Sequence, residues 1–149
     1  MGDEEWENQI KVNLFGTHYV TQSCIPDMME ASWGRVVNVS SVSAMQGGGR
    51  KTGVAYSASK AALLGFGKAL AREVGNKNIT VNTIAPGPIK TQMLGEVTED
   101  HEATLSSDGV TPYIGTGDNV ASAIEYLFTE SARFITGHTL HINGGLYMA

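Results

Sequence analysis

The strongest constraint on this chain is a regular alternation between long helical patterns and short β-branched runs. Arg35–Ser40 and Ile79–Ala85 are rich in valine, isoleucine and threonine, so each predicts a buried strand. His138–Ile142 predicts a third strand. Helices are predicted where apolar residues recur at steps of three and four, in Glu5–Glu30, Val54–Val74 and Asn119–Glu130. A helix thus precedes each strand, which predicts one α/β domain with a parallel sheet covered by helices.

Smaller features refine this outline. Pro26 lies near the end of the first helical pattern, and we expect it to kink or shorten that helix. Asp118 is predicted to cap the helix that follows it. The stretch between Gln92 and Gly117 is polar and irregular, with one short helix predicted near Glu99–Leu105. This stretch therefore joins the second strand to the third helix largely as a loop.

Composition excludes several classes of function. The chain has 149 residues, a formal net charge of -5 and a pI of about 5.3, and its basic residues are scattered. Nucleic acid and anionic membranes are therefore not expected as partners, because such surfaces require clustered cations. The single cysteine, Cys24, is expected to be a small buried hydrophobe and cannot form an internal disulfide. With no predicted signal peptide or membrane span, we expect a cytoplasmic location.

The sharpest chemical pattern is the pair Tyr56 and Lys60, which stand four residues apart and so share one face of a predicted helix. A nearby ammonium favours the phenolate form of a tyrosine, which suits proton transfer. Taken alone, the pair is far more typical of a helix surface with no chemical role. Ser40 and Ser41 strengthen the chemical interpretation because they end a predicted strand, where ligands bind in open α/β sheets.

Two further polar positions allow more than one interpretation. Asn13 is an amide within an apolar helical pattern, so it either faces solvent or holds a helix bend and a proton relay. His138 and His141 lie three apart on a predicted strand and point to opposite faces, without cysteine or carboxylate neighbours in the sequence. No metal site is therefore expected.

Five ordered motifs resemble those of the short-chain dehydrogenase/reductase family, and most closely its 3-oxoacyl-carrier-protein-reductase-like branch. They begin with Val12-Asn13-Leu14-x-Gly16 and Asn38-Val39-Ser40-Ser41, continue through Tyr56-x-x-x-Lys60 and Ile79-Thr80-Val81-Asn82-x-x-Ala85-Pro86-Gly87, and end with Phe134-Ile135-Thr136-Gly137 through Gly144-Gly145. Each motif alone is weak, whereas all five in the family's order and at nearly its spacing are specific. The resemblance implies a Rossmann-like doubly wound parallel sheet.

The resemblance also implies roles for individual residues. Tyr56 would donate or accept the proton as a carbonyl and a secondary alcohol interconvert, and Lys60 would assist it and bind the nicotinamide ribose of NAD or NADP. Ser41 would orient the carbonyl of a small-molecule substrate, and Asn13 would support a water relay to Lys60. Residues of a loop would lie against the nicotinamide, namely Pro86, Gly87, Ile89 and Thr91.

The sequence departs from the family pattern at its beginning. No G-x-G-x-x-G follows a predicted strand, so the turn that would receive the pyrophosphate is missing. At ~30 residues per βα unit, on the order of 100 residues of dinucleotide-binding βαβ units are absent. Residues 1–149 are therefore expected to form the C-terminal catalytic part of the domain, truncated to strands five, six and seven. Strand Val36–Ser40 would have an unpaired edge, and cofactor binding would be weak.

Two functions remain open at this stage. The first is an NAD(P)-dependent oxidoreductase, and the second is a truncated, non-catalytic fragment that acts only by assembly. Helices 5–30 and 54–74 resemble the family's subunit-interface helices, so a homo-oligomer is expected through them. The loop between Val42 and Ala55 is slightly longer than the family's, with Arg50-Lys51-Thr52 as the insertion.

Overall fold

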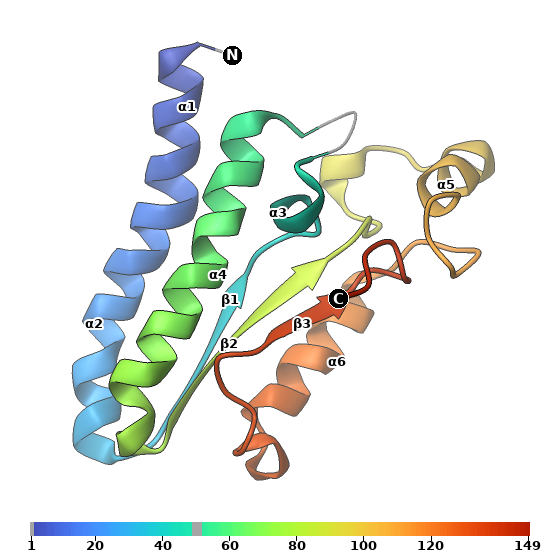
Figure 1. The fold of residues 1–149 in the computed structure, drawn as a ribbon. Coiled ribbons are helices and arrows are strands. Elements are labelled where there is room, and N and C mark those ends of the chain that lie inside the picture. Colours follow the sequence, from blue (N-terminus) through green and yellow to red (C-terminus); the bar gives the residue numbers. More distant parts are fainter. Residues whose placement is uncertain (1, 49–51) are drawn as a thin grey trace.

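A parallel three-stranded sheet forms the centre of the molecule. The computed structural model describes residues 2–48 and 52–149. Its strands are β1 (Gly34–Val39), β2 (Ile79–Pro86) and β3 (Thr139–Ile142), paired in parallel in the order β1-β2-β3 (Figure 1). The predicted strands and their parallel arrangement are thus confirmed, with strand ends shifted by one residue.

Helices cover both faces of this sheet. The first helical layer consists of α1 (Asp3–Ile10), the π-helical segment η1 (Lys11–Phe15), α2 (Gly16–Ala31) and α4 (Val54–Val74). The opposite face carries α6 (Gly117–Phe128) (Figure 1). Shorter helical elements complete the chain, namely α3 (Ser43–Gln46), η2 (Gly75–Lys77), η3 (Gln92–Leu94), α5 (Glu99–Ser106) and η4 (Glu130–Ala132).

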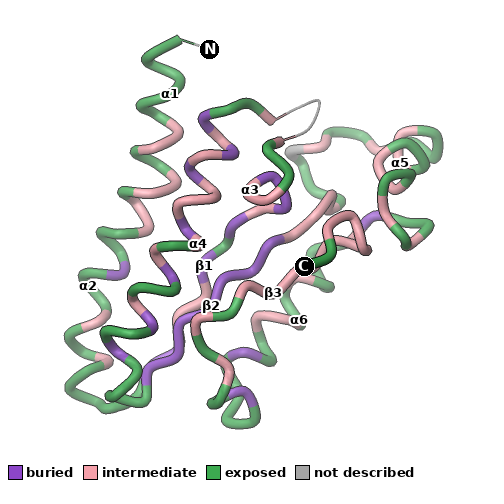
Figure 2. The backbone as a smooth tube through the Cα atoms, in the orientation of Figure 1, coloured by how far each residue is buried: buried purple, intermediate pink, exposed green. Residues whose placement is uncertain are grey.

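The core lies between α4 and the sheet. Leu63 of α4 and Val81 and Ile84 of β2 are almost completely buried. Figure 2 shows the buried residues concentrated along β1, β2 and one side of α4, whereas α1 and α2 are mostly exposed. Because apolar burial is the dominant favourable term in folding, α4 and β2 form the most strongly held part of the molecule.

β1 is an edge strand within the described residues, as predicted for the segment Val36–Ser40, because it pairs with β2 alone. The N–H groups of Gly34 and Ser40 donate to carbonyls of Asn78 and Ile84. Since alternate residues of a parallel strand bond to the same neighbour, the backbone groups of Arg35, Val37 and Val39 face away from β2.

Two local predictions were wrong, and a third was wrong in part. α2 is not shortened at Pro26 but continues to Ala31, and an irregular helical turn occurs earlier, at η1 around Asn13. Thr116, and not Asp118, is the N-cap of α6, where it forms a capping box with Asn119. Cys24 is exposed, because it lies on the side of α2 that faces away from the core.

Two further sequence features can be placed only in part. Arg50 and Lys51, in the insertion predicted between Val42 and Ala55, lie outside the described residues. Among the residues that are described, no helix combines the length and apolarity needed to cross a bilayer. The same residues contain no group of three or more histidine, cysteine, aspartate or glutamate side chains placed to hold a metal ion.

Candidate active site

The carboxyl end of β1 is fastened to the N-terminal half of α4 by two hydrogen bonds. The hydroxyl of Ser40 donates to the backbone carbonyl of Lys60 over 2.7 Å. In return, Nζ of Lys60 donates to the carbonyl of Val39 over 2.9 Å. This carbonyl belongs to the set that faces away from β2, so Lys60 occupies part of the free edge of β1. The strand end and the helix are therefore held in one fixed arrangement.

Tyr56 and Lys60 share one face of α4, as their spacing predicts. Nζ of Lys60 lies 5.8 Å from the centre of the Tyr56 ring, and both side chains are half-buried. Burial of the ammonium lowers the pKa of Lys60 below its ordinary value of 10.5. A cation beside a phenol stabilises the phenolate, so the pair is suited to proton transfer.

Ser41 lies between the end of β1 and the start of α3. Its Oγ accepts the backbone N–H of Ser43 over 3.2 Å, and the side chain is half-buried. The neighbouring backbone is tied to β2, because the N–H of Val42 donates to the carbonyl of Pro86 over 2.8 Å. The Ser41 hydroxyl is thus presented from a well-anchored turn, and it keeps its own proton as a donor.

Asn13 belongs to this network through an intermediate residue. It lies at the centre of the π-helical turn η1, and its Nδ2 donates to Oγ of Ser59 over 3.0 Å. Ser59 is completely buried, and its hydroxyl donates to the carbonyl of Tyr56 over 2.8 Å. The irregular turn therefore brings the Asn13 amide onto α4, one residue before Lys60.

The loop after β2 contains the other predicted residues. The N–H of Gly87 donates to the carbonyl of Ile142, and a Cβ at this glycine would meet the backbone of Asn143 at 2.9 Å. Ile89 forms an isolated bridge with Gly115. Pro86, Gly87 and Ile89 are thus fixed beside the strand ends. Thr91 lies exposed at the start of η3, beyond these contacts.

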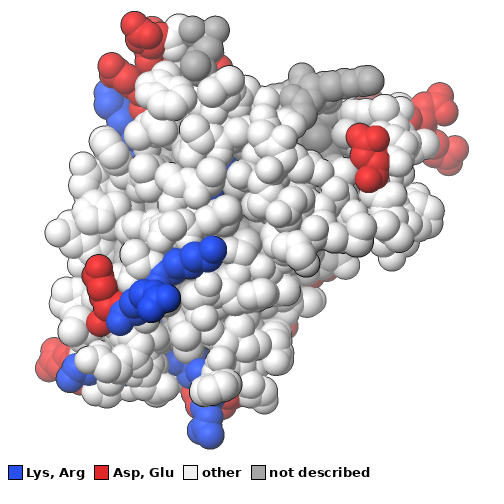
Figure 3. Space-filling model, in the orientation of Figure 1, with Lys and Arg blue, Asp and Glu red and all other residues white. Residues whose placement is uncertain are grey.

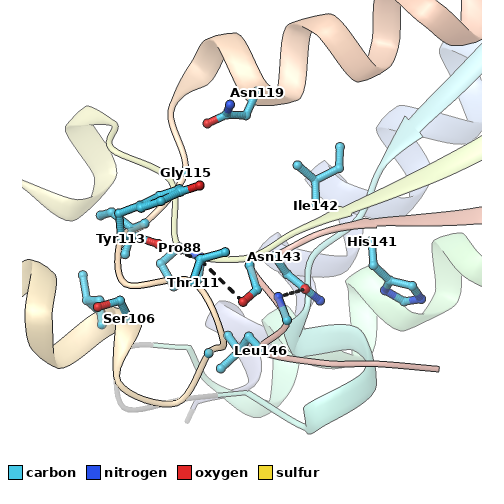
Figure 4. Close-up of a pocket in the computed structure, with 15 residues that line it drawn as sticks. Pro88, Ser106, Thr111, Tyr113, Gly115, Asn119, His141, Ile142, Asn143 and Leu146 are labelled. Atoms are coloured by element: carbon cyan, nitrogen blue, oxygen red, sulfur yellow. Dashed lines mark hydrogen bonds between the residues drawn. The ribbon is translucent and has the colours of Figure 1, made fainter.

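A cavity of about 320 Å³ opens beside this loop (Figure 4). Its wall includes Pro88 from the loop, Leu105 and Ser106 from α5, and Asn119 from α6. The rest of the lining comes from residues within two segments, 109–115 and 141–146, and includes Thr111, Tyr113 and Asn143. The lining contains no aspartate, glutamate, lysine or arginine, and burial together with neighbouring His138 lowers the pKa of the His141 imidazole, which favours its neutral form.

Comparisons with known proteins agree with this fold. The model of the family described as enoyl-(acyl carrier protein) reductase matches residues 1–147. The chain is 42% identical over 146 residues to nodulation protein G of Azospirillum brasilense. It is 38% identical over 148 residues to 3-oxoacyl-acyl-carrier-protein reductase of Escherichia coli strain K12. These matches cover 98% and 99% of the chain but 58% and 60% of the two relatives.

Solved structures show the same relationship. A 3-oxoacyl-acyl-carrier-protein reductase from Brucella melitensis superposes with a TM-score of 0.94 at 36% identity, covering all of this chain and 55% of that one. A 4-hydroxyisoleucine dehydrogenase complexed with NADH superposes with a TM-score of 0.88 at 34% identity, covering 97% of this chain and 60% of that one. The fold is therefore the Rossmann-like one predicted, and the chain belongs to the short-chain dehydrogenase/reductase family. It spans about 60% of the length of the curated relatives it matches.

The sequence did not predict every member of this network. Ser59 links Asn13 to Tyr56, yet in the Tyr56-x-x-x-Lys60 motif its position is not specified. Its position three residues after Tyr56 is the one clue, because residues three apart are neighbours on a helix. The Val39 carbonyl carries no side-chain signal at all. Only the pairing of β1 shows that this group is free to accept from Lys60.

Proposed function

We propose that this chain is the catalytic C-terminal part of an NAD(P)-dependent oxidoreductase that interconverts a carbonyl and a secondary alcohol. The observation that carries this proposal is that the end of β1, next to Ser41, is joined to the helix that holds Tyr56 and Lys60. Two hydrogen bonds of Lys60 make this connection, one through its backbone carbonyl and one through its Nζ. A donor hydroxyl, a phenol and a cation therefore stand on two fastened elements at the carboxyl end of a parallel sheet, where ligands bind in such folds.

In the proposed reaction each side chain has one task. Tyr56 gives its phenolic proton to the carbonyl oxygen during reduction and takes it back during oxidation. The Lys60 ammonium stabilises the phenolate that remains. The Ser41 hydroxyl donates a hydrogen bond to the same oxygen as negative charge develops. Asn13 holds α4 at Ser59 and so supports the proton path behind Lys60.

The residues present are compatible with the nicotinamide end of the cofactor, which would supply the hydride. An ammonium has three donors, and Lys60 uses one of them on Val39, which leaves others for ribose hydroxyls. At Gly87 the backbone of the loop packs directly on Asn143, and this contact holds the neighbouring Pro86 and Ile89 in position. We include Thr91 in this set on the family's motif alone.

Cofactor titration tests the expected weak binding. The chain's sequence contains no G-x-G-x-x-G turn to receive a pyrophosphate, so NADH and NADPH should bind only at millimolar concentrations or above. Fluorescence titration of the purified chain with each cofactor measures this affinity. Micromolar binding of either cofactor would contradict the proposal that this chain contacts the nicotinamide end alone and does not bind the pyrophosphate.

The role of Tyr56 needs a catalytically competent form, obtained by fusing the chain behind the N-terminal βαβ units of a relative. Tyr56→Phe should then lower carbonyl reduction by at least a hundredfold, because the proton donor is lost. Tyr126→Phe on α6 is the matched control and should leave the rate unchanged. If Tyr56→Phe and Tyr126→Phe had equal activity, the proton donor would be assigned wrongly.

Assembly is a second candidate function, favoured by the exposed face of α1, η1 and α2. Val12, Tyr19 and Val20 on this face are 72%, 59% and 67% exposed. In Figure 3 one group of basic and acidic side chains crosses the left of the face shown below its middle, the other charged side chains lie toward its margins, and the area between them is uncharged. We propose that helices 5–30 and 54–74 bury this surface in a homo-oligomer, because large exposed apolar patches mark association sites.

The mass of the chain in solution tests the proposed assembly. Light scattering during gel filtration should give a multiple of 15.8 kDa for the native chain. The variant Val12→Asp/Val20→Asp should be a monomer, because it places charge on the buried interface. Val110→Asp is the control, since Val110 is equally exposed (73%) but lies on a loop far along the chain. A native chain that is monomeric would exclude the proposed interface.

A further inference from the structure

Helix α5 forms one wall of the cavity but has few polar connections to the rest of the molecule. Leu105 and Ser106 contribute to the lining at its C-terminal end (Figure 4). Figure 1 shows α5 set apart from the sheet and from the long helices. Its position over the cavity therefore needs a specific explanation, because packing of this helix against another layer does not supply one.

A single carboxylate connects α5 to the two segments beside it. Oε2 of Glu102 accepts a hydrogen bond from Nζ of Lys90 over 2.7 Å, and Lys90 lies in the loop after β2. Oε1 of Glu102 accepts the backbone N–H of Ile114 over 3.4 Å, in the segment that leads to α6. The Glu102 side chain is 23% exposed and that of Lys90 is 45% exposed, so this ion pair is partly shielded from water.

The remaining polar contacts of α5 are local. Thr98 caps its N-terminus by accepting the N–H of His101, and Thr104 donates to the carbonyl of Asp100 one turn earlier. Ser106 donates to the carbonyl of Ala103. Within residues 2–48 and 52–149, the Glu102 carboxylate thus provides the side-chain hydrogen bonds that reach from α5 to the chain segments on both sides of it.

We propose that Glu102 is a positioning residue that holds α5 in place as a wall of the cavity and thereby controls access to it. Lys90 and Ile114 lie on opposite sides of the segment 92–113, whose ends are already joined by backbone hydrogen bonds between Lys90 and Gly115 and between Gly115 and Pro88. A carboxylate bonded to Lys90 and Ile114 therefore ties the helix in the middle of this segment to both of its ends. Without the carboxylate, α5 would separate from the loop and the cavity would open on the side of Leu105. Control of substrate access by this helix rests on the proposed function, whereas the position of the helix does not.

Hydrogen exchange measured by mass spectrometry tests this role without cofactor or turnover. Glu102→Ala removes both bonds and should speed amide exchange in residues 99–115 on the order of tenfold. Glu102→Gln keeps an acceptor for Ile114 but loses the ion pair, and should speed exchange about threefold. Exchange in β2 should not change in either variant, which distinguishes local opening from loss of the fold.

Two further variants make the test specific. Glu99→Gln removes the same charge from the same helix at an exposed site and should leave the exchange of residues 99–115 unchanged. The double variant Lys90→Glu/Glu102→Lys restores the ion pair with reversed charges but offers the Ile114 N–H no acceptor, so it should recover only the protection that the ion pair supplies and exchange about as fast as Glu102→Gln. The proposal is overturned if Glu102→Ala exchanges like Glu99→Gln, or if the double variant is no better protected than Glu102→Ala. Neither result would bear on the roles of Tyr56 and Lys60.

Discussion

The α4–β1–β2 centre and the α5 segment are held in place by different kinds of interaction. In the centre, Leu63 and Ile84 are 1% and 0% exposed, and strand and helix are joined by short hydrogen bonds at Lys60. In α5 no residue is buried, and the carboxylate of Glu102 links the helix to Lys90 and to the Ile114 N–H. The residues proposed for chemistry therefore stand on packed elements, whereas the cavity wall depends on a contact that can be broken locally.

The largest difference should appear when a leucine is truncated in each region. Leu63→Ala removes a fully buried side chain, so we expect a loss of about 3 kcal/mol in the free energy of unfolding. Leu105→Ala truncates a half-buried side chain on α5 and should cost about 1 kcal/mol or less. Urea unfolding followed by circular dichroism measures both. Equal losses would show that α5 is packed as firmly as the centre.

A smaller effect should appear at two glycines of α4 that lie two residues apart. A Cβ at Gly67 would meet Oγ1 of Thr83 at 2.7 Å and Nδ2 of Asn38 at 3.2 Å, so Gly67→Ala should destabilise the fold by about 2 kcal/mol. A Cβ at Gly65 would meet nothing within 4 Å, and alanine is the better helix former. Gly65→Ala should therefore stabilise the protein by about 0.5 kcal/mol.

Thermal unfolding of the two glycine variants under identical conditions provides the comparison. Opposite signs are expected because the two positions share a helix and differ in their distance from the sheet. If Gly67→Ala were as stable as Gly65→Ala, the close approach of α4 to β1 and β2 would be wrong.

The smallest expected effect is a pH-dependent loosening confined to α5. The hydrogen bond from Lys90 lowers the pKa of Glu102 below 4.5, and the Ile114 N–H acts in the same direction, while burial opposes both. Because the pKa is lower in the folded state, the contribution of Glu102 is complete above its unfolded value and is lost as pH falls through the folded value. Acidification should therefore speed exchange in residues 99–115 before it affects β2.

Exchange rates collected across the acid range, corrected for the intrinsic pH dependence of amide exchange, would measure this loosening. Glu102→Gln should abolish the local pH dependence, since an amide does not titrate in this range. Loosening that persisted in Glu102→Gln would have to be assigned to another group.

Much of the fold could be predicted because its signals are local and repeated. The period of apolar residues in Val54–Val74 predicted α4 with both ends correct, and the β-branched runs located β1 and β2. The spacing of Tyr56 and Lys60 on a helix placed them on one face, which the distance between them confirms. These patterns depend on residues close together in the sequence, so they can be recognised without the tertiary structure.

The local errors have equally specific causes. Asp118 and Thr116 are both residue types that cap helices well. Thr116 caps α6 because Asn119, three residues later, completes a capping box with it. Pro26 leaves α2 intact because it lies on an exposed side of the helix, where the freed carbonyl of Gln22 can bond to water. In each case the outcome depended on which partner group was within reach.

The sequence by itself determined the class of fold, the parallel order of the strands and the helix that presents Tyr56 and Lys60. It did so because periodicity and motif spacing record which side of each element faces the core. Only the tertiary structure decided which groups those residues bond to: Lys60 with the free Val39 carbonyl, Asn13 with Ser59, and Glu102 with Lys90 and Ile114. Such contacts join segments far apart in the chain, and their hydrogen-bond geometry is set by packing that no local pattern encodes.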